Sequence, residues 1–160
     1  MKIKQGPLKC WDIYAMHLVE QSKSFTVRED IKALSILKDK YKWNFNIADM
    51  LSNKAFDAIV LTSIDREILW VNKGFTKMTG YSTKFALGKQ PSFLQGEKTT
   101  KASLDAIKTG LQQQSPFTNQ IINYKKNGSL YNCELHIYPL KNKADTVTHF
   151  IAIEKELRLF

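Results

Sequence analysis

The side chains that could carry out catalysis are few, and they are scattered along the chain. His17, His136 and His149 are isolated from one another and lack metal-ligand spacing. The two cysteines, Cys10 and Cys133, have no C-x-x-C spacing, and we interpret them as reduced packing residues. We find no G-x-S-x-G sequence, no phosphate-binding glycine loop and no paired carboxylates. The sequence therefore predicts a protein that is not an enzyme, with its histidines at the surface or at a sheet edge.

The composition is that of a single globular domain with a small appendage. The chain has 160 residues, of which 43% are hydrophobic and 24% charged. Its net charge of +9 would permit binding to nucleic acid, but the lysines are spread singly, as on a solvated surface. No apolar run is long enough to span a membrane, and residues 1–7 lack the apolar core of a signal peptide. We expect a cytoplasmic protein without membrane contact.

The elements that would hold a site begin with an N-terminal helical extension over residues 1–46. Apolar residues recur at helical spacing over residues 8–21, and Ser22–Phe25 interrupts the pattern. Thr26 and Glu29 then match a capping box that would begin a second helix. This pattern predicts a helical hairpin. A hairpin cannot bury both of its apolar stripes alone, so it must pack on the following domain, on a second copy or on another protein.

Residues 47–160 predict a domain of strands interrupted by short helices. A short helix over 47–51 comes first, and a helix within Glu97–Leu111 has Thr99 or Thr100 as its cap. Asn127-Gly128 is a strong hairpin signal between the two longest strands. The five predicted strands are Phe56–Ser63, Glu67–Val71, Phe117–Lys126, Leu130–Leu140 and Thr146–Lys155.

The stretch Val71–Gly96 predicts several very short helices in series. Asn72 can cap the first of them and Gly80 can end it, while Ser82–Leu87 forms a second that stops at Gly88. Helices this short do not make a bundle. They are typical of a layer that covers a sheet.

The order of residues in this stretch resembles a known family. It reads V-N-x-x-F-x-x-M-T-G-Y-S and then A-L-G-x-x-x-x-F-L-Q-G, which is similar to the PAS domain, and in particular to its light-oxygen-voltage (LOV) branch. The resemblance continues into 123–128 and 134–139. It implies an α+β fold, a five-stranded antiparallel sheet with short helices on one face, here preceded by the N-terminal helical extension.

The LOV resemblance also implies a flavin site, and this chain departs from it at the reacting residue. LOV domains form a covalent bond between the flavin and a cysteine within G-x-N-C-R-F-L-Q-G. The matching residue here is Pro91, which has no thiol, so adduct chemistry is excluded at that position. Ser92 stands where the family has a phosphate-binding arginine, and Gln90 where it has an asparagine.

The remaining flavin contacts implied by the resemblance are partly retained. Gln95 and Asn123 are unaltered, whereas Lys108 replaces an arginine without its bidentate geometry. Cys133 replaces a second asparagine, and Glu154 replaces the glutamine of the last strand. A buried carboxyl could bond a flavin carbonyl only when protonated. The candidate pocket positions are therefore Gln90, Gln95, Lys108, Asn123, Cys133 and Glu154, facing an apolar stripe that suits either a small ligand or a filled core.

Three functions follow from these observations. The first is a stand-alone PAS sensory module that acts through protein–protein contact, as a homodimer or with an unknown downstream protein. Its contact surface would be the N-terminal helices, with Trp11, Leu18 and Leu34, or the outer sheet face, with Tyr124 and Tyr138. The second is a cysteine-free photosensor that binds flavin mononucleotide (FMN). The third is a basic accessory protein that binds nucleic acid, which the scattered lysines do not favour.

Overall fold

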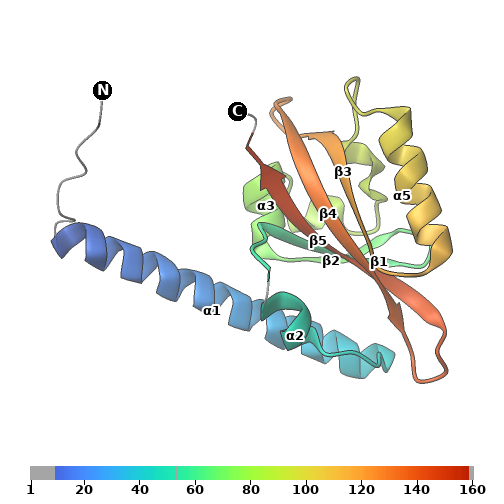
Figure 1. The fold of residues 1–160 in the computed structure, drawn as a ribbon, viewed down its shortest axis with the longest axis horizontal. Helices are drawn as coiled ribbons and strands as arrows, with labels where there is room; N and C mark the ends of the chain where they lie inside the picture. Colours follow the sequence, from blue (N-terminus) through green and yellow to red (C-terminus); the bar gives the residue numbers. More distant parts are fainter. Residues whose placement is uncertain (1–9, 53, 159–160) are drawn as a thin grey trace.

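The computed structural model describes residues 10–52 and 54–158, and its elements follow the predicted order. The α+β prediction is confirmed, with short helices between the second and third strands (Figure 1). The elements are α1 (Cys10–Tyr41), α2 (Ile47–Ser52), β1 (Ala58–Ser63), β2 (Ile68–Val71), α3 (Lys73–Thr79), α4 (Thr83–Ala86), the 3-10 helix η1 (Pro91–Leu94), α5 (Lys101–Gln113), β3 (Phe117–Tyr124), β4 (Leu130–Lys141) and β5 (Val147–Leu157).

The five strands form one sheet in the order β2-β1-β5-β4-β3, and all neighbouring pairs are antiparallel. The last strand in sequence therefore lies at the centre. Between β3 and β4 the Asn127-Gly128 turn closes the hairpin, with Gly128 at φ 85° and its N–H donating to the Lys125 carbonyl. A positive φ of this size is readily adopted only by glycine.

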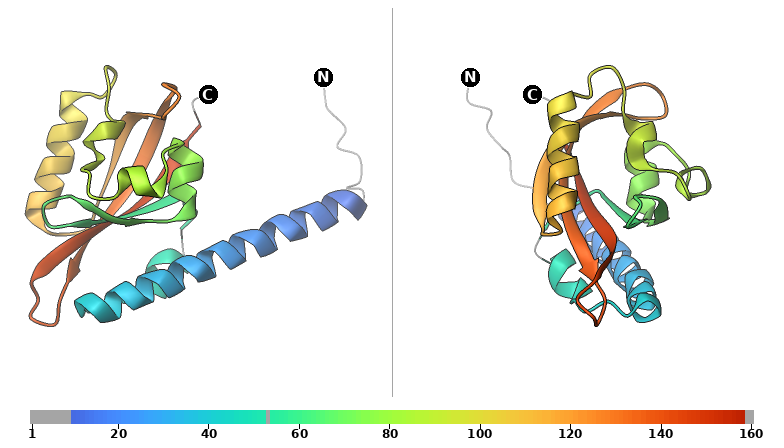
Figure 2. Two further views of the ribbon diagram at one scale, coloured as in Figure 1. Left: turned by 180° about the vertical axis from the view of Figure 1, so that it is seen from behind. Right: turned by 90° about the vertical axis from the view of Figure 1, so that its right-hand side faces the viewer.

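The two faces of the sheet are covered by different helices. Side chains alternate along a strand, so β1 directs Ala58 and Val60 to one face and Ile59 and Leu61 to the other. Helices α3, α4, η1 and α5 pack on the first face, which we call the inner face (Figure 2). The C-terminal half of α1 and all of α2 pack on the outer face.

The predicted helical hairpin is wrong, because α1 is one continuous helix across residues 22–25. This segment contains neither glycine nor proline, so nothing in the backbone requires a break. The Thr26 hydroxyl donates to the Ser22 carbonyl, one turn earlier, at 3.0 Å instead of capping a new helix. The proposed boundary between residues 46 and 47 is a prediction that the structure does not test.

Helix α1 lies on the sheet only along its C-terminal half. Leu34 is fully buried against β1 and β5, so α1 packs on the sheet of its own chain. The N-terminal half extends beyond the sheet, as Figure 1 and the left view of Figure 2 show. It exposes large apolar side chains: Ile13, Tyr14, Met16, Leu18, Val19 and Phe25.

The helices on the inner face lie close to their predicted positions, although their bounds differ: α4 is Thr83–Ala86, within the predicted Ser82–Leu87. The Asn72 side chain accepts from Phe75 N–H to cap α3, and Gly80 ends that helix at φ 79°. Thr100, not Thr99, caps α5, which begins at Lys101 rather than at Glu97. These caps satisfy amides that would otherwise be unpaired at the helix ends.

Candidate ligand cavity

A cavity of about 360 Å³ lies between the inner face of the sheet and the helices η1 and α5. Its size is within the range of small-molecule sites in proteins. The lining residues are Val60, Thr62, Arg66, Gln90, Pro91, Ser92, Leu94, Gln95, Leu104, Asp105, Ile107, Lys108, Leu111, Ile121, Asn123, Leu135, Ile137, Phe150, Ala152 and Glu154.

The cavity has an apolar floor and a polar rim. Its buried lining residues are mostly aliphatic or aromatic and come from the strands, for example Val60, Ile121 and Phe150. Its exposed lining residues are polar or charged and come from loops, η1 and α5: Arg66, Gln90, Ser92, Gln95, Asp105 and Lys108. A ligand with an apolar body and a charged or polar end would match this division.

Asn123 is the buried polar group that most directly indicates a ligand. It is 6% exposed and lines the cavity, and its Oδ1 has no hydrogen-bond partner in the described part of the chain. The hydroxyl of Tyr131, its pairing neighbour on β4, also meets no partner with good hydrogen-bond geometry there, although the Asn123 side chain lies near enough to influence the pKa of Tyr131. A buried acceptor without a donor costs roughly 1–3 kcal/mol, so Asn123 is suited to accept a hydrogen bond from a bound molecule.

Glu154 is a second buried polar group on the floor. Burial raises its pKa to about 7, so the carboxyl is neutral at mildly acidic pH and can then donate a hydrogen bond. Its Oε2 lies 3.9 Å from the Cys133 sulfur. Burial, followed by the charge of Glu154, raises the pKa of Cys133, which keeps that thiol protonated and unreactive.

The rim contains a residue that the sequence did not single out. Arg66 lies in the turn between β1 and β2, at φ 69°, and lines the cavity. The Gln90 side chain does not enter the cavity freely, since its Nε2 donates to the Asp65 carbonyl at 3.0 Å. This bond joins η1 to the turn that carries Arg66. No local pattern in the sequence signals it, because the two residues are far apart in the chain.

Most of the candidate pocket positions are brought together at this cavity. Gln90, Gln95, Lys108, Asn123 and Glu154 all line it, as do Pro91 and Ser92. Cys133 does not line it: this residue is fully buried in the inner-face core beside Glu154. The structure thus groups these residues, while their contact with a ligand is a prediction.

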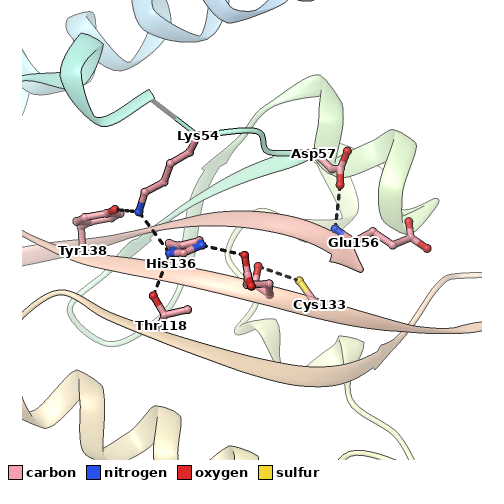
Figure 3. A network of polar contacts seen from close by, with 8 residues as sticks. Lys54, Asp57, Thr118, Cys133, His136, Tyr138 and Glu156 are labelled. Carbon is pink, nitrogen blue, oxygen red and sulfur yellow. Dashed lines mark hydrogen bonds and ion pairs between the residues drawn. The ribbon is translucent and has the colours of Figure 1, made fainter. Parts of the chain in front are cut away.

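A separate polar network lies on the outer face of the sheet (Figure 3). Lys54 contacts Tyr138 and His136, and His136 also contacts Thr118 at 2.9 Å and Glu134 at 3.0 Å. These are neighbouring side chains on one solvated surface. In the described residues we find no group of three or more side chains that could hold a metal ion.

The expectation of a surface histidine is wrong for His149. This residue is buried, and its Nδ1 accepts from the Trp43 indole at 3.2 Å. Burial lowers the pKa of His149, which favours the neutral ring that the bond requires. Tyr124 is also engaged within the chain, because its hydroxyl accepts from Lys98 N–H in the loop before α5.

A larger hollow of about 540 Å³ lies between α3 and the ends of β4 and β5. Lys77, Glu156 and Arg158 give it charged walls. It contains none of the candidate pocket positions.

Across the described residues, no helix is both long and apolar enough to cross a membrane.

Comparison with known protein families gives one matching domain. The family model described as PAS domain matches residues 57–158. The chain belongs to the PAS domain family. The part of this PAS domain that carries the cavity is built from β1, the short helices and the three long strands, all within the matched range.

The similar curated proteins are much longer than this chain. A blue-light-activated histidine kinase of Brucella canis is 36% identical over 95 residues, which cover 59% of this chain and 19% of that protein. The corresponding protein of Brucella anthropi is 32% identical over the same length. This PAS domain therefore spans about a fifth of the relatives that it matches.

Solved LOV structures share the fold. The light-state structure of the Aureochrome1 LOV domain has a TM-score of 0.63 at 20% identity, covering 71% of this chain and 90% of that one. The LOV domain from the Erythrobacter litoralis EL346 blue-light-activated histidine kinase has a TM-score of 0.61 at 24% identity, covering 67% and 100%. The PAS domain described here is LOV-like in its fold and in the motifs of its short helices.

Proposed function

We propose that this chain is a cytoplasmic PAS sensory module, without enzyme activity, that signals through protein–protein contact made by α1. The same proposal holds that it does not form a cysteinyl-flavin adduct, since Pro91 occupies the matching position and has no thiol. The observation that carries the proposal is the row of apolar side chains that α1 leaves exposed.

This row follows one side of the helix along most of its length. Tyr14, Leu18, Phe25 and Ile36 fall within about 40° of one another at 100° per residue, and they are 55%, 47%, 62% and 63% exposed. The opposite side, with Asp30 and Leu34, packs on the sheet. We call this row the outward stripe. An apolar stripe at this spacing favours packing against another helix.

We propose a second copy of the chain as the occupant of the outward stripe. A twofold pairing would place the same stripe of each protomer against the other and bury both together. The N-terminal half would gain most from such pairing, because Tyr14 and Leu18 lie in the part of α1 that extends beyond the sheet.

Light scattering over a range of protein concentrations tests this proposal. We expect a dimer at high micromolar concentration and a monomer for Leu18→Glu, since a charge in the interface cannot be desolvated cheaply. Ile64→Glu is the matched control, because Ile64 is 44% exposed in the turn after β1 and lies outside the stripe. A monomeric wild-type protein, or equal dimerisation by both variants, would contradict the proposal.

A second function is supported by the cavity: a cysteine-free photosensor that binds a flavin. The apolar floor suits a flat ring, Asn123 offers an unpaired acceptor for a ring N–H, and Glu154 can donate when protonated. When bound, a flavin would supply blue-light absorption. The chain's own residues would bind and orient it and exclude water, and Pro91 would leave the ring without a covalent partner.

An absorption spectrum of freshly purified protein, with mass spectrometry of the molecules released on denaturation, tests this second function. Blue absorption together with a released flavin would support it. A colourless protein that also fails to take up added flavin would remove it and leave the protein-contact function alone.

A further inference from the structure

The rim of the cavity carries two cationic side chains from separate elements, Arg66 and Lys108. Lys108 stands where the LOV resemblance implies an arginine that contacts the flavin. We propose that Arg66 joins Lys108 in binding the anionic group of a ligand whose flat ring occupies the cavity, and that Gln90 positions the turn carrying Arg66. This inference rests on the ligand-binding form of the proposed function, and it assigns Arg66 and Gln90 roles that the family motif does not give them.

The first argument is the way in which Arg66 is held. The turn is fixed at its base by Arg66 N–H donating to the Ser63 carbonyl at 3.0 Å, and from the side by the Gln90 amide on the Asp65 carbonyl. Arg66 has a φ of 69°, a left-handed conformation that non-glycine residues adopt at some cost. A turn fixed by contacts on both sides presents its side chain to the cavity with less loss of conformational freedom on binding.

The second argument is the balance of charge at the rim. Asp105 also lines the cavity, but its Oδ2 lies 2.6 Å from the Lys101 ammonium, which offsets its charge. Arg66 and Lys108 are involved in no ion pair among the described residues. The rim is therefore cationic, although Ser92 stands where the LOV motif has an arginine. Arg66 brings a guanidinium to the rim from another part of the chain.

The third argument is that the floor excludes an anion. The floor is apolar, and its titratable group, Glu154, is an acid. An anion placed there would be desolvated without a cation to pair with. A ligand with both a flat apolar body and a negative group must therefore direct that group to the rim. A phosphate can accept two parallel hydrogen bonds from a guanidinium, which gives Arg66 the stronger contact and Lys108 the weaker.

The test compares FMN with riboflavin, which has the same ring but no phosphate, by fluorescence titration of the full chain. We expect FMN to bind at least ~10-fold more tightly at low salt, with the ratio falling as salt is added. Arg66→Gln is expected to weaken FMN about tenfold and leave riboflavin unchanged, and Lys108→Gln to do the same to a smaller extent. Arg28→Gln, on the exposed surface of α1, is the control and should change neither ligand.

Gln90→Leu separates positioning from direct contact. It removes the bond to Asp65 but no charge, so we expect a loss for FMN alone, smaller than that of Arg66→Gln. If riboflavin binds and FMN binds no more tightly, the anion-binding rim is wrong and the flavin function survives. If neither compound binds, both are wrong. A variant that weakens both ligands equally would show a structural effect and would overturn the assignment of that residue.

Discussion

The two faces of the sheet have the same strands but very different interiors. On the outer face, Ile59, Leu61 and Ile151 are fully buried under α1 and α2. On the inner face, a cavity of about 360 Å³ remains, with Asn123 and Glu154 buried at its floor. A packed face contributes stability, whereas a hollow face with unsatisfied polar groups costs stability unless something binds there. The contrast assigns much of the domain's stability to the packing of α1 and α2 on the outer face, and it supports the proposal that the inner face binds a ligand.

The largest loss of stability should come from replacing a leucine with alanine, and the loss should differ between the two faces. Leu61→Ala, on the packed face, is expected to lower the free energy of unfolding by about 3 kcal/mol, because it leaves a new cavity. Leu135→Ala, at the cavity floor, should cost about half as much, since part of that side chain already borders empty space. Urea denaturation measures both. Equal losses would mean that the inner face is as tightly packed as the outer.

The buried acid of the inner face should make stability depend on pH. Burial raises the pKa of Glu154 to about 7, from an ordinary value of 4.5. Between these values the folded state holds a proton that the unfolded state releases, so stability falls as pH rises through this window. Glu154→Gln should be more stable than wild type by about 2–3 kcal/mol above pH 8 and little different near pH 4.5.

Urea denaturation across pH 4.5–8.5 measures this effect. Glu97→Gln, an exposed acid outside the cavity, is the matched control and should follow the wild-type profile. A Glu154→Gln profile parallel to that of the wild type would show that the carboxyl titrates normally.

One buried hydrogen bond joins the two regions. The Asn72 amide, which caps α3 on the inner side, donates to Asp30 Oδ2 of α1 at 2.9 Å. Asp30→Ala leaves this donor unpaired and should lower the free energy of unfolding by about 1–2 kcal/mol. The loss is limited because the buried Asp30 carboxylate is itself poorly solvated, as its raised pKa indicates. Hydrogen exchange should also accelerate at Ile59 N–H and Phe75 N–H, which both donate to Asn72 Oδ1.

Asp30→Asn is the conservative variant, since its amide oxygen can accept the same bond and should largely restore stability. Asp39→Ala, an exposed acid on the same helix, should change little. If Asp30→Ala also changes little, α1 is not tied to α3 through this bond.

The smallest effect is expected from filling the cavity. Ile137→Phe adds volume at the floor and should raise stability by about 0.5–1 kcal/mol, whereas Ile59→Phe on the packed face should destabilise the protein by overpacking. Thermal unfolding of the two variants measures the difference. A loss of stability for Ile137→Phe would mean that the floor cannot accept a larger side chain.

The fold was largely predictable from local signals. The strands alternate in burial as their sequences suggest, and Asn72, Gly80 and Asn127-Gly128 mark real helix ends and a real hairpin. These signals act between residues close in sequence, so the sequence alone contains them. The continuous α1 was missed for a related reason: Thr26 and Glu29 match a cap locally, but a threonine hydroxyl can equally donate within a helix.

The site was predictable only in part. Residues on regular strands and helices, such as Asn123, Glu154 and Lys108, follow from motif and register. Arg66 does not, because its place depends on a turn held by Gln90 across the fold. Cys133 was expected in the pocket, but it lies in the core beside the cavity. Register shows which face a strand residue occupies, not how the volume on that face is shared.

The length of α1 has a mechanical consequence. The segment 10–25 extends about 24 Å beyond the sheet at 1.5 Å per residue, and the first strong anchor after it is Asp30, held by the residue that caps α3. A rigid-body tilt of α1 would therefore pivot at Asp30, next to the residue that caps α3. A tilt of only about 5° at Asp30 would move the far tip, about 30 Å away, by roughly 3 Å. A displacement too small to open the core would then be large enough to misalign two helices packed along their lengths.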